Sequence, residues 1–126
     1  MGLCCRGCPR GEGEHIVTIS SDAGRKVSPS LAVYSASKSF VEALSQGLRL
    51  ETAGMGVKVT TVRPGNVATG LLDAGTDEEA LERYTQRNGV QVLEPEDVAA
   101  SVAWALTRTD PVAVNEVLVE HRDEPA

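Results

Sequence analysis

Aromatic residues and lysine are scarce in this chain, and no basic stripe runs along it. The 126 residues include one Trp, one Phe and two Tyr, and the only lysines are Lys26, Lys38 and Lys58. Asp and Glu outnumber Lys and Arg by 18 to 12, which gives a formal net charge of −6. A negative charge without clustered cations disfavours binding to nucleic acids and to anionic membrane surfaces. We therefore expect neither as a partner.

Long hydrophobic runs are also absent. No apolar stretch approaches the roughly 20 residues that a membrane-spanning helix needs, and the N-terminus lacks the apolar core of a signal peptide. Arg6 stands where a myristoylation signal has Ser or Thr. We expect a cytoplasmic protein, and its 126 residues allow one domain at most.

Cysteine occurs only near the N-terminus, as Cys4, Cys5 and Cys8. Cys5 and Cys8 form one CxxC pair, which is compatible with a redox dithiol or with part of a metal site. A structural zinc ion needs about four ligands, and Cys4 and His15 are the only other candidates nearby. Three clustered cysteines do not make a disulfide framework. We expect no metal site.

The glycines of the same segment have the spacing of a phosphate-binding turn. Gly7, Gly11 and Gly13 follow the Gly-x-x-x-Gly-x-Gly spacing, but that spacing binds phosphate only between a strand and a helix. Neither is predicted around it. The chain divides into three expected parts, an atypical flexible leader, a partial catalytic domain and a disordered tail, at residues 1–13, 14–121 and 122–126.

The rest of the chain alternates between strand and helix patterns. A β-branched run at residues 16–19 is typical of a strand and ends in a loop rich in Ser and Gly. Apolar residues then recur at helical spacing over residues 32–52. Further elements are predicted as strands at residues 57–63 and 115–120 and as helices at residues 76–87 and from residue 95. Strands that alternate with helices imply parallel pairing through right-handed crossovers.

Ser21, Tyr34 and Lys38 form the most informative constellation. Tyr34 and Lys38 lie four residues apart on the predicted helix and share one face, and Ser21 follows the preceding strand. A phenol alone is a weak acid near neutral pH, because its unperturbed pKa is about 10, but an adjacent ammonium group favours the phenolate. The pair can therefore exchange a proton with a carbonyl or alcohol oxygen that the Ser hydroxyl polarises.

This pattern predicts carbonyl/alcohol redox chemistry, for which a cofactor must supply the hydride. The alternative is structural, because Tyr and Lys at this spacing are common on helices and usually have no catalytic role. The strand-Ser-Ser-x-Ala-Gly context and the fixed interval from Ser21 to Tyr34 favour the catalytic interpretation.

The same residues resemble the active-site segment of the short-chain dehydrogenase/reductases, whose pattern is a strand, then Ser-Ser-x-x-Gly, then Tyr-x-Ala-Ser-Lys. Residues 64–69, Pro-Gly-Asn-Val-Ala-Thr, resemble that family's Pro-Gly-x-Val-x-Thr turn. The resemblance covers roughly residues 14–120. It implies the C-terminal part of a Rossmann-type, doubly wound α/β fold, with about three parallel strands and flanking helices and without the N-terminal cofactor-binding half.

The resemblance also assigns roles to individual residues. Tyr34 would be the acid–base group, Lys38 would tune it and bind a ribose hydroxyl, and Ser21 would polarise the substrate carbonyl. The cofactor would be NAD or NADP, with NADP favoured. Besides Tyr34 and Lys38, the expected cofactor contacts are Pro64, Gly65, Val67 and Thr69. The expected substrate-lining residues, unless they are ordinary packing residues, are Leu71, Leu72 and Tyr84.

The expected function is that of an NAD(P)-dependent oxidoreductase acting on a small carbonyl or alcohol, with some likeness to members that use hydroxy acids or amino-acid alcohols. The alternative is a non-catalytic remnant that binds no dinucleotide and at most associates with other subunits, so the activity of this chain is a separate question from its family. The outer edge of its first strand would be bare. The family pairs subunits through the Tyr/Lys helix, so we expect a homo-oligomer or self-association.

Overall fold

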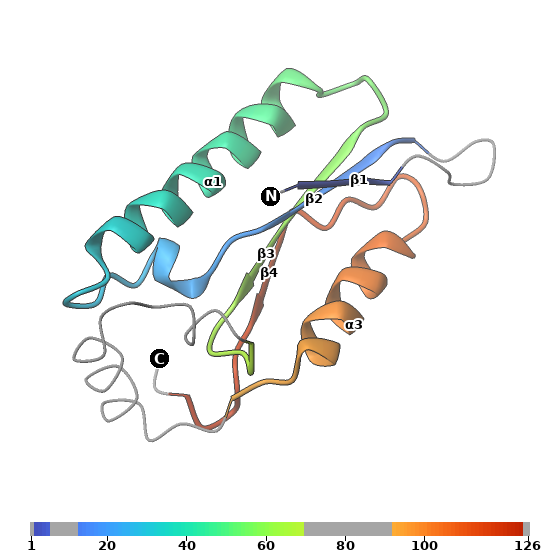
Figure 1. Ribbon diagram of the computed structural model, residues 1–126. Helices are drawn as coiled ribbons and strands as arrows, with labels where there is room; N and C mark the ends of the chain where they lie inside the picture. The colour runs from blue at the N-terminus through green and yellow to red at the C-terminus, as the bar shows by residue number, and fades with distance from the viewer. Residues whose placement is uncertain (1, 6–12, 70–91, 125–126) are drawn as a thin grey trace.

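The computed structural model describes residues 2–5, 13–69 and 92–124 and shows one four-stranded sheet flanked by two helices (Figure 1). The strands are ordered β1-β2-β3-β4 across the sheet. Their bounds are Gly2–Cys5 for β1, His15–Ile19 for β2, Lys58–Pro64 for β3 and Glu116–Val119 for β4. The helical elements are the short 3₁₀ turn η1 at Asp22–Gly24, α1 at Ala32–Glu51 and α3 at Pro95–Leu106.

Strands β2, β3 and β4 are parallel, as the sequence predicts. Strand β3 lies between the other two, with Thr18 opposite Thr61 and Thr61 opposite Glu116. Val59 and Val62 of β3 are buried, because this strand has a neighbour on each side and a helix over each face. The carboxyl ends of the three strands therefore lie at one edge of the sheet.

Helix α1 also agrees with its predicted bounds. Gly54 and Gly56 follow it with φ angles of 81° and 75°, a left-handed conformation that glycine adopts without steric cost. The chain turns there and enters β3. The predicted α/β class with flanking helices is confirmed.

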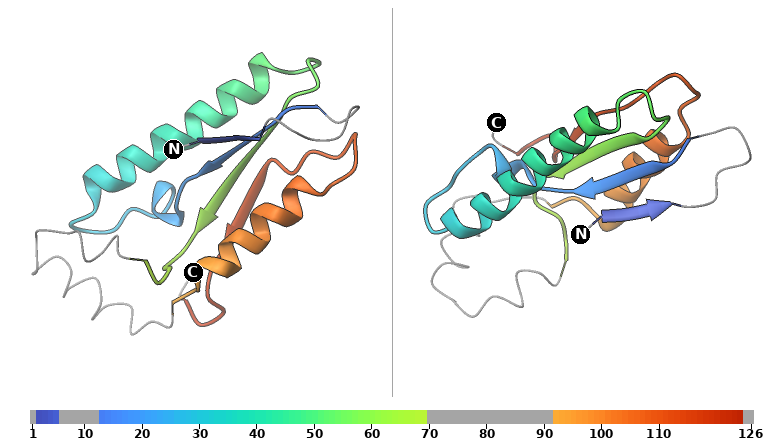
Figure 2. Two further views of the ribbon diagram at one scale, coloured as in Figure 1. Left: turned by 45° about the vertical axis from the view of Figure 1, so that its right-hand side comes forward. Right: turned by 90° about the horizontal axis from the view of Figure 1, so that it is seen from above.

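Helices α1 and α3 cover opposite faces of the sheet (Figures 1 and 2). The strand order advances in one direction from β2 through β3 to β4, so two crossovers with helices on opposite faces have opposite hands. The connection through α1 is right-handed, and the one through α3 is left-handed. The expectation of right-handed crossovers is therefore wrong for the second connection. A prediction takes the right hand by default, because about 98% of such crossovers have it.

Strand β1 is the element that the sequence did not predict. It pairs antiparallel with β2, with Gly2 opposite Thr18 and Cys5 opposite His15. The outer edge of β2, which we expected to be bare, therefore has a hydrogen-bonded neighbour. The sequence Gly-Leu-Cys-Cys contains no β-branched residue and no alternation of polar and apolar residues, so it carries no local strand signal.

The face of the sheet under α1 carries a layer of buried hydroxyl groups. On the α1 side, Thr18 Oγ1 lies 2.8 Å from Ser45 Oγ and 3.3 Å from Thr61 Oγ1, and all three residues are buried. Because side chains alternate along a strand, Val17 and Val62 point to the α3 side, where both are buried. Helix α1 therefore packs on a layer of hydrogen-bonded hydroxyl groups, whereas the α3 side combines these valines with the buried pair His15 and Thr60, whose Nε2 and Oγ1 atoms lie 2.6 Å apart.

The outward face of α1 is apolar. Val33, Phe40 and Leu50 are 86%, 66% and 75% exposed. The apolar periodicity that predicted this helix thus arises partly from side chains that face away from the sheet.

Neither described helix is long and apolar enough to cross a lipid bilayer. Among the described residues, no group of His, Cys, Asp or Glu side chains could hold a metal ion. The predicted helix at 76–87 and the expected substrate-lining residues Leu71, Leu72 and Tyr84 lie outside the described residues.

Candidate active site

Ser21 lies directly after β2 and caps the turn η1. Its Oγ accepts a hydrogen bond from Ala23 N at 3.2 Å and donates one to Asp22 Oδ1 at 3.0 Å, and the residue is buried. Short polar side chains favour such turns because they bond to nearby backbone N–H groups. The Ser21 hydroxyl is therefore held near the carboxyl edge of the sheet.

Tyr34 and Lys38 lie one turn apart on α1. Lys38 Nζ is 5.6 Å from the centroid of the Tyr34 ring, which is within cation–π range. The ammonium also donates a hydrogen bond to Ile19 O at 3.3 Å, so the Lys38 side chain points back to the end of β2. Burial lowers the pKa of Lys38, because desolvation disfavours the charged form.

The structure thus brings Lys38 to the strand end that precedes Ser21, with the half-buried Tyr34 beside it. The Ser21 hydroxyl makes its hydrogen bonds within its own turn. Convergence of the Ser21 and Tyr34 hydroxyls on one substrate oxygen stays a prediction.

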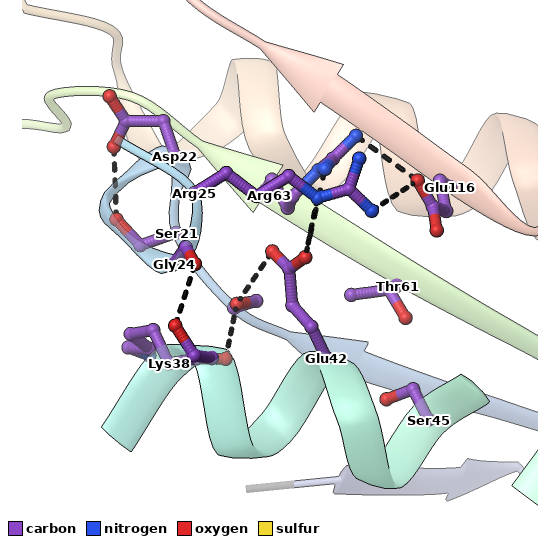
Figure 3. Close-up of polar contacts among 12 residues, drawn as sticks. Ser21, Asp22, Gly24, Arg25, Lys38, Glu42, Ser45, Thr61, Arg63 and Glu116 are labelled. Carbon is purple, nitrogen blue, oxygen red and sulfur yellow. Dashed lines mark hydrogen bonds and ion pairs between the residues drawn. The ribbon is translucent and has the colours of Figure 1, made fainter. Parts of the chain in front are cut away.

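Ser20 and Glu42 adjoin this site, and the sequence analysis did not single them out. Ser20 Oγ lies 3.2 Å from Lys38 O and 3.3 Å from Glu42 Oε1, so it links the end of β2 to the helix turn that carries Lys38. Figure 3 shows Glu42 projecting from α1 toward Arg25 and Arg63. A sequence signal existed for Glu42, because it follows Lys38 by four residues and shares its helix face.

The turn after β3 lies at the same edge of the sheet. Gly65 N donates to Val119 O at 2.8 Å, which ties the turn to β4. Val67 forms an isolated parallel bridge with Leu93, and its carbonyl oxygen accepts a hydrogen bond from Thr69 N at 2.8 Å. Val67 is half-buried and Thr69 is exposed. Pro64, which ends β3, is buried.

Glu124, from the segment after β4, packs on this turn. Its Oε1 accepts a hydrogen bond from Asn66 Nδ2 at 2.9 Å, and its Oε2 accepts one from Asn66 N at 3.4 Å. A Cβ atom on Gly65 would collide with the Glu124 carboxylate, so this contact requires glycine there. The sequence analysis assigned Glu124 to the tail, and no local pattern signals a partner so distant in the chain.

The surroundings of Lys38 fit a ligand with hydroxyl groups. Within the described part of the chain, Lys38 Nζ makes one hydrogen bond, to Ile19 O, whereas an ammonium has three N–H donors. The remaining donors could bind a ribose hydroxyl, and the exposed Thr69 could bind an amide. Residues 13–69 and 92–124 contain no strand, glycine turn and helix in the order that receives a pyrophosphate. The described residues thus offer donors that a ribose hydroxyl and an amide could use.

A family model for short chain dehydrogenases matches residues 4–80. This match begins ten residues before the point at which the sequence analysis placed the start of the resemblance, and it includes part of β1.

The chain is similar to several curated proteins in sequence and to several solved structures in fold. The chain is 61% identical over 116 residues to glycine betaine reductase ATRR of Emericella nidulans, covering 92% of this chain and 9% of that protein. It is 40% identical over 105 residues to an uncharacterized oxidoreductase of Staphylococcus aureus strain USA300, covering 83% of this chain and 41% of that protein. The closed form of serine dehydrogenase complexed with NADP+ matches with a TM-score of 0.70 and 33% identity, over 83% of this chain and 43% of that chain.

The chain spans about two fifths of the length of the S. aureus oxidoreductase and a much smaller share of the E. nidulans reductase. The family model nevertheless covers more than half of the chain, and the parallel sheet with its flanking helices agrees with it. The chain belongs to the short-chain dehydrogenase family of oxidoreductases.

Proposed function

We propose that the chain carries the proton-transfer residues of an NAD(P)-dependent carbonyl/alcohol oxidoreductase, with Tyr34, Lys38 and Ser21 in catalytic roles. The observation that carries the proposal is the position of the Lys38 ammonium, 5.6 Å from the Tyr34 ring and 3.3 Å from Ile19 O. A partly desolvated cation therefore lies beside a phenol at the carboxyl edge of a parallel sheet, where α/β folds commonly bind ligands.

Each residue has a defined task in this proposal. When bound, the nicotinamide would supply the hydride for the substrate carbon, or accept it in the reverse direction. In the reductive direction Tyr34 Oη donates its proton to the carbonyl oxygen, which becomes a hydroxyl, and the Lys38 ammonium stabilises the phenolate that remains. Ser21 Oγ donates to the same oxygen as negative charge develops on it. For this, Ser21 must exchange its present acceptor, Asp22 Oδ1, for the substrate.

We extend the proposal to the cofactor contacts of the turn after β3. Val67 and Thr69 would bind the carboxamide of the nicotinamide, and NADP is favoured over NAD. Serine dehydrogenase, which is 33% identical to this chain, was solved as a complex with NADP+.

The substrate that we propose is a small carbonyl compound of the glycine betaine type, or the corresponding alcohol. The glycine betaine reductase of E. nidulans is 61% identical over 92% of this chain. A net charge of −6 also favours the approach of a cationic substrate over that of an anionic one.

The test uses the purified full chain. NADPH and NADH are titrated by fluorescence, and NADPH oxidation is then followed with betaine aldehyde, the aldehyde that corresponds to glycine betaine. We expect Tyr34→Phe to lower kcat by about 100-fold or more, because general acid catalysis is lost, and to weaken cofactor binding by no more than about tenfold, because a single hydrogen bond is lost. Phe keeps the ring and removes only the hydroxyl, so packing on α1 is preserved.

Two results would contradict the proposal. If neither cofactor binds at millimolar concentration, the alternative holds, in which the chain is a non-catalytic member that at most associates with other subunits. If turnover occurs and is equal in wild type and Tyr34→Phe, the role assigned to Tyr34 is wrong.

A further inference from the structure

The loop after β2 is hydrogen-bonded to α1 at the helix turn that carries Lys38. Ser20 Oγ has one proton and two acceptors within reach, Lys38 O at 3.2 Å and Glu42 Oε1 at 3.3 Å. From the same helix turn, Ser39 Oγ donates to Gly24 O at 2.7 Å. A Cβ atom on Gly24 would lie only 3.0 Å from Glu42 Oε1. Loop and helix are therefore in close contact at Glu42.

Glu42 binds this loop a second time, through its other carboxylate oxygen. Arg25 Nε donates to Glu42 Oε2 at 2.8 Å, and Arg63 Nη1 of β3 lies 3.7 Å from the same oxygen. The side chains of Glu42 and Arg63 are only 13% and 11% exposed. Solvent ions therefore screen this pair much less than a surface pair.

Strand β4 completes the charged cluster. Glu116 Oε2 accepts a hydrogen bond from Arg25 Nη2 at 2.9 Å and lies 3.3 Å from Arg63 Nη2. Figure 3 shows Arg25 and Arg63 lying between the carboxylates of Glu42 and Glu116. The arginines thus connect α1 to β4 across β3, and Glu42 is the member of the cluster that also contacts Ser20.

Ser21 lies between the two points at which Glu42 holds the loop. Ser20 precedes it and contacts one Glu42 oxygen, and Arg25 follows it and contacts the other. Glu42 itself is one helical turn after Lys38. The two oxygens of one carboxylate therefore contact the loop on both sides of Ser21. The same carboxylate belongs to a residue one helical turn from Lys38.

We propose that Glu42 is a positioning residue, whose two carboxylate oxygens hold the loop of Ser20 and Arg25 against α1 and thereby fix Ser21 relative to Lys38. The effect of Glu42 on catalysis rests on the proposed function, whereas its effect on the position of the loop does not. Glu42 acts on the reaction only through Ser21 and Lys38.

The ionisation of Lys38 tests this role without any substrate. The chain has three lysines, so their Cε signals can be assigned in a carbon-13-labelled sample of the full chain by means of Lys26→Arg and Lys58→Arg. Loss of a negative charge by itself lowers the pKa of a nearby ammonium, whereas release of the loop hydrates the ammonium and raises it. The two explanations therefore predict shifts of opposite sign.

We expect Glu42→Ala to raise the pKa of Lys38 by roughly half a unit or more. Glu42→Gln keeps an oxygen that can accept from Ser20, so we expect a smaller change. The matched control is Glu51→Ala, which removes the same group from an exposed position at the end of α1 and should leave Lys38 unchanged. Ser20→Ala breaks the link from the loop side and should shift Lys38 upward, which decides the matter if Glu42→Ala does not fold.

An unchanged or lower Lys38 pKa in the folded Glu42→Ala variant, or in Ser20→Ala if the former does not fold, would overturn the proposal. The result is separable from the proposed function. If the wild-type chain shows no turnover, the proposed function fails and the Lys38 titration still decides the positioning role. If it does turn over, we expect Glu42→Ala to lower kcat about tenfold with little change in KM.

Discussion

At the scale of single residues, His15 occupies an unusually constrained environment. It is buried in β2, and its Nε2 lies 2.6 Å from Thr60 Oγ1. The Thr60 hydroxyl donates its own proton to Val114 O at 2.6 Å, so Thr60 Oγ1 is the acceptor and His15 Nε2 carries a hydrogen. Burial, and then the positive charge of Lys58, lower the pKa of His15. The folded protein therefore favours the neutral ring.

We expect this residue to make folding sensitive to mild acid. The unfolded chain binds the His15 proton more tightly than the folded protein does, so protonation favours unfolding. The neutral His15 ring makes its full contribution to the free energy of unfolding above the pKa of the unfolded chain, about 6.5. This contribution is lost as the pH falls from there toward the lower pKa of His15 in the folded protein. Urea unfolding at about pH 7.5 and about pH 5.5 should show the loss.

The comparison that isolates His15 uses both histidines. His15→Gln should flatten the pH dependence between about 7.5 and 5.5, whereas His121→Gln, in the segment after β4, should retain it. An equal dependence in wild type and His15→Gln would show that other groups cause it.

At the scale of elements, two glycines have contrasting surroundings: one lies in open space and the other in close contact with the backbone. Gly47 lies inside α1, where an added Cβ would meet no other atom within 4 Å. Gly13 precedes β2, and a Cβ there would overlap the backbone carbonyl of Gly56. Backbone atoms cannot move aside as the end of a flexible side chain can, so the two positions should respond differently to the same substitution.

We expect Gly47→Ala to raise the free energy of unfolding by about 0.5–1 kcal/mol, because alanine is the better helix former. We expect Gly13→Ala to lower it by more than that amount, because β2 and the turn before β3 must separate. Chemical denaturation of both variants under one set of conditions measures the two effects. Destabilisation by Gly47→Ala would contradict the open surroundings of α1 at this position.

Most elements were predictable because their signals are local. The β-branched runs of β2 and β3 and the helical spacing of α1 lie within single segments of the sequence. Strand β1 carries no such signal, since its pairing depends on the free edge of β2. The left-handed connection through α3 depends on which face of the sheet that helix covers, and no local pattern encodes this.

The candidate site divides in the same way. Tyr34 and Lys38 were predictable because one helix sets their spacing, and the Ser21 segment because a strand and turn precede it. The contacts of Glu42 with Ser20 and of Glu124 with Asn66 join positions 22 and 58 residues apart. Only the packing of α1 and of the segment after β4 creates them.

At the scale of the whole molecule, the exposed apolar face of α1 favours association. Val33, Phe40 and Leu44 are exposed and, at spacings of seven and four residues, share one face of the helix, and exposed apolar patches commonly mark interaction surfaces. We expect the chain to self-associate as its concentration rises, with a second copy of itself as the partner.

Sedimentation velocity over a range of concentrations tests this expectation. Phe40→Ser should shift the distribution toward the monomer, because it removes the largest side chain of this face. Met55→Ser, at an exposed apolar residue in the turn after α1, should have little effect. A wild-type chain that stays monomeric at every concentration would contradict the expectation.

The polar layer beneath α1 also determines how accurately that helix is seated. Dispersion contacts between smooth apolar surfaces change little when a helix slides or rotates slightly, whereas hydrogen bonds weaken steeply with distance and angle. A rotation of α1 would break the Thr18–Ser45 contact at 2.8 Å, because these two side chains are too short to follow the movement of the helix. The layer thereby fixes the position of α1 along its axis and its rotation about that axis. Because Tyr34 is part of this helix, its position relative to the ends of the strands is fixed as well.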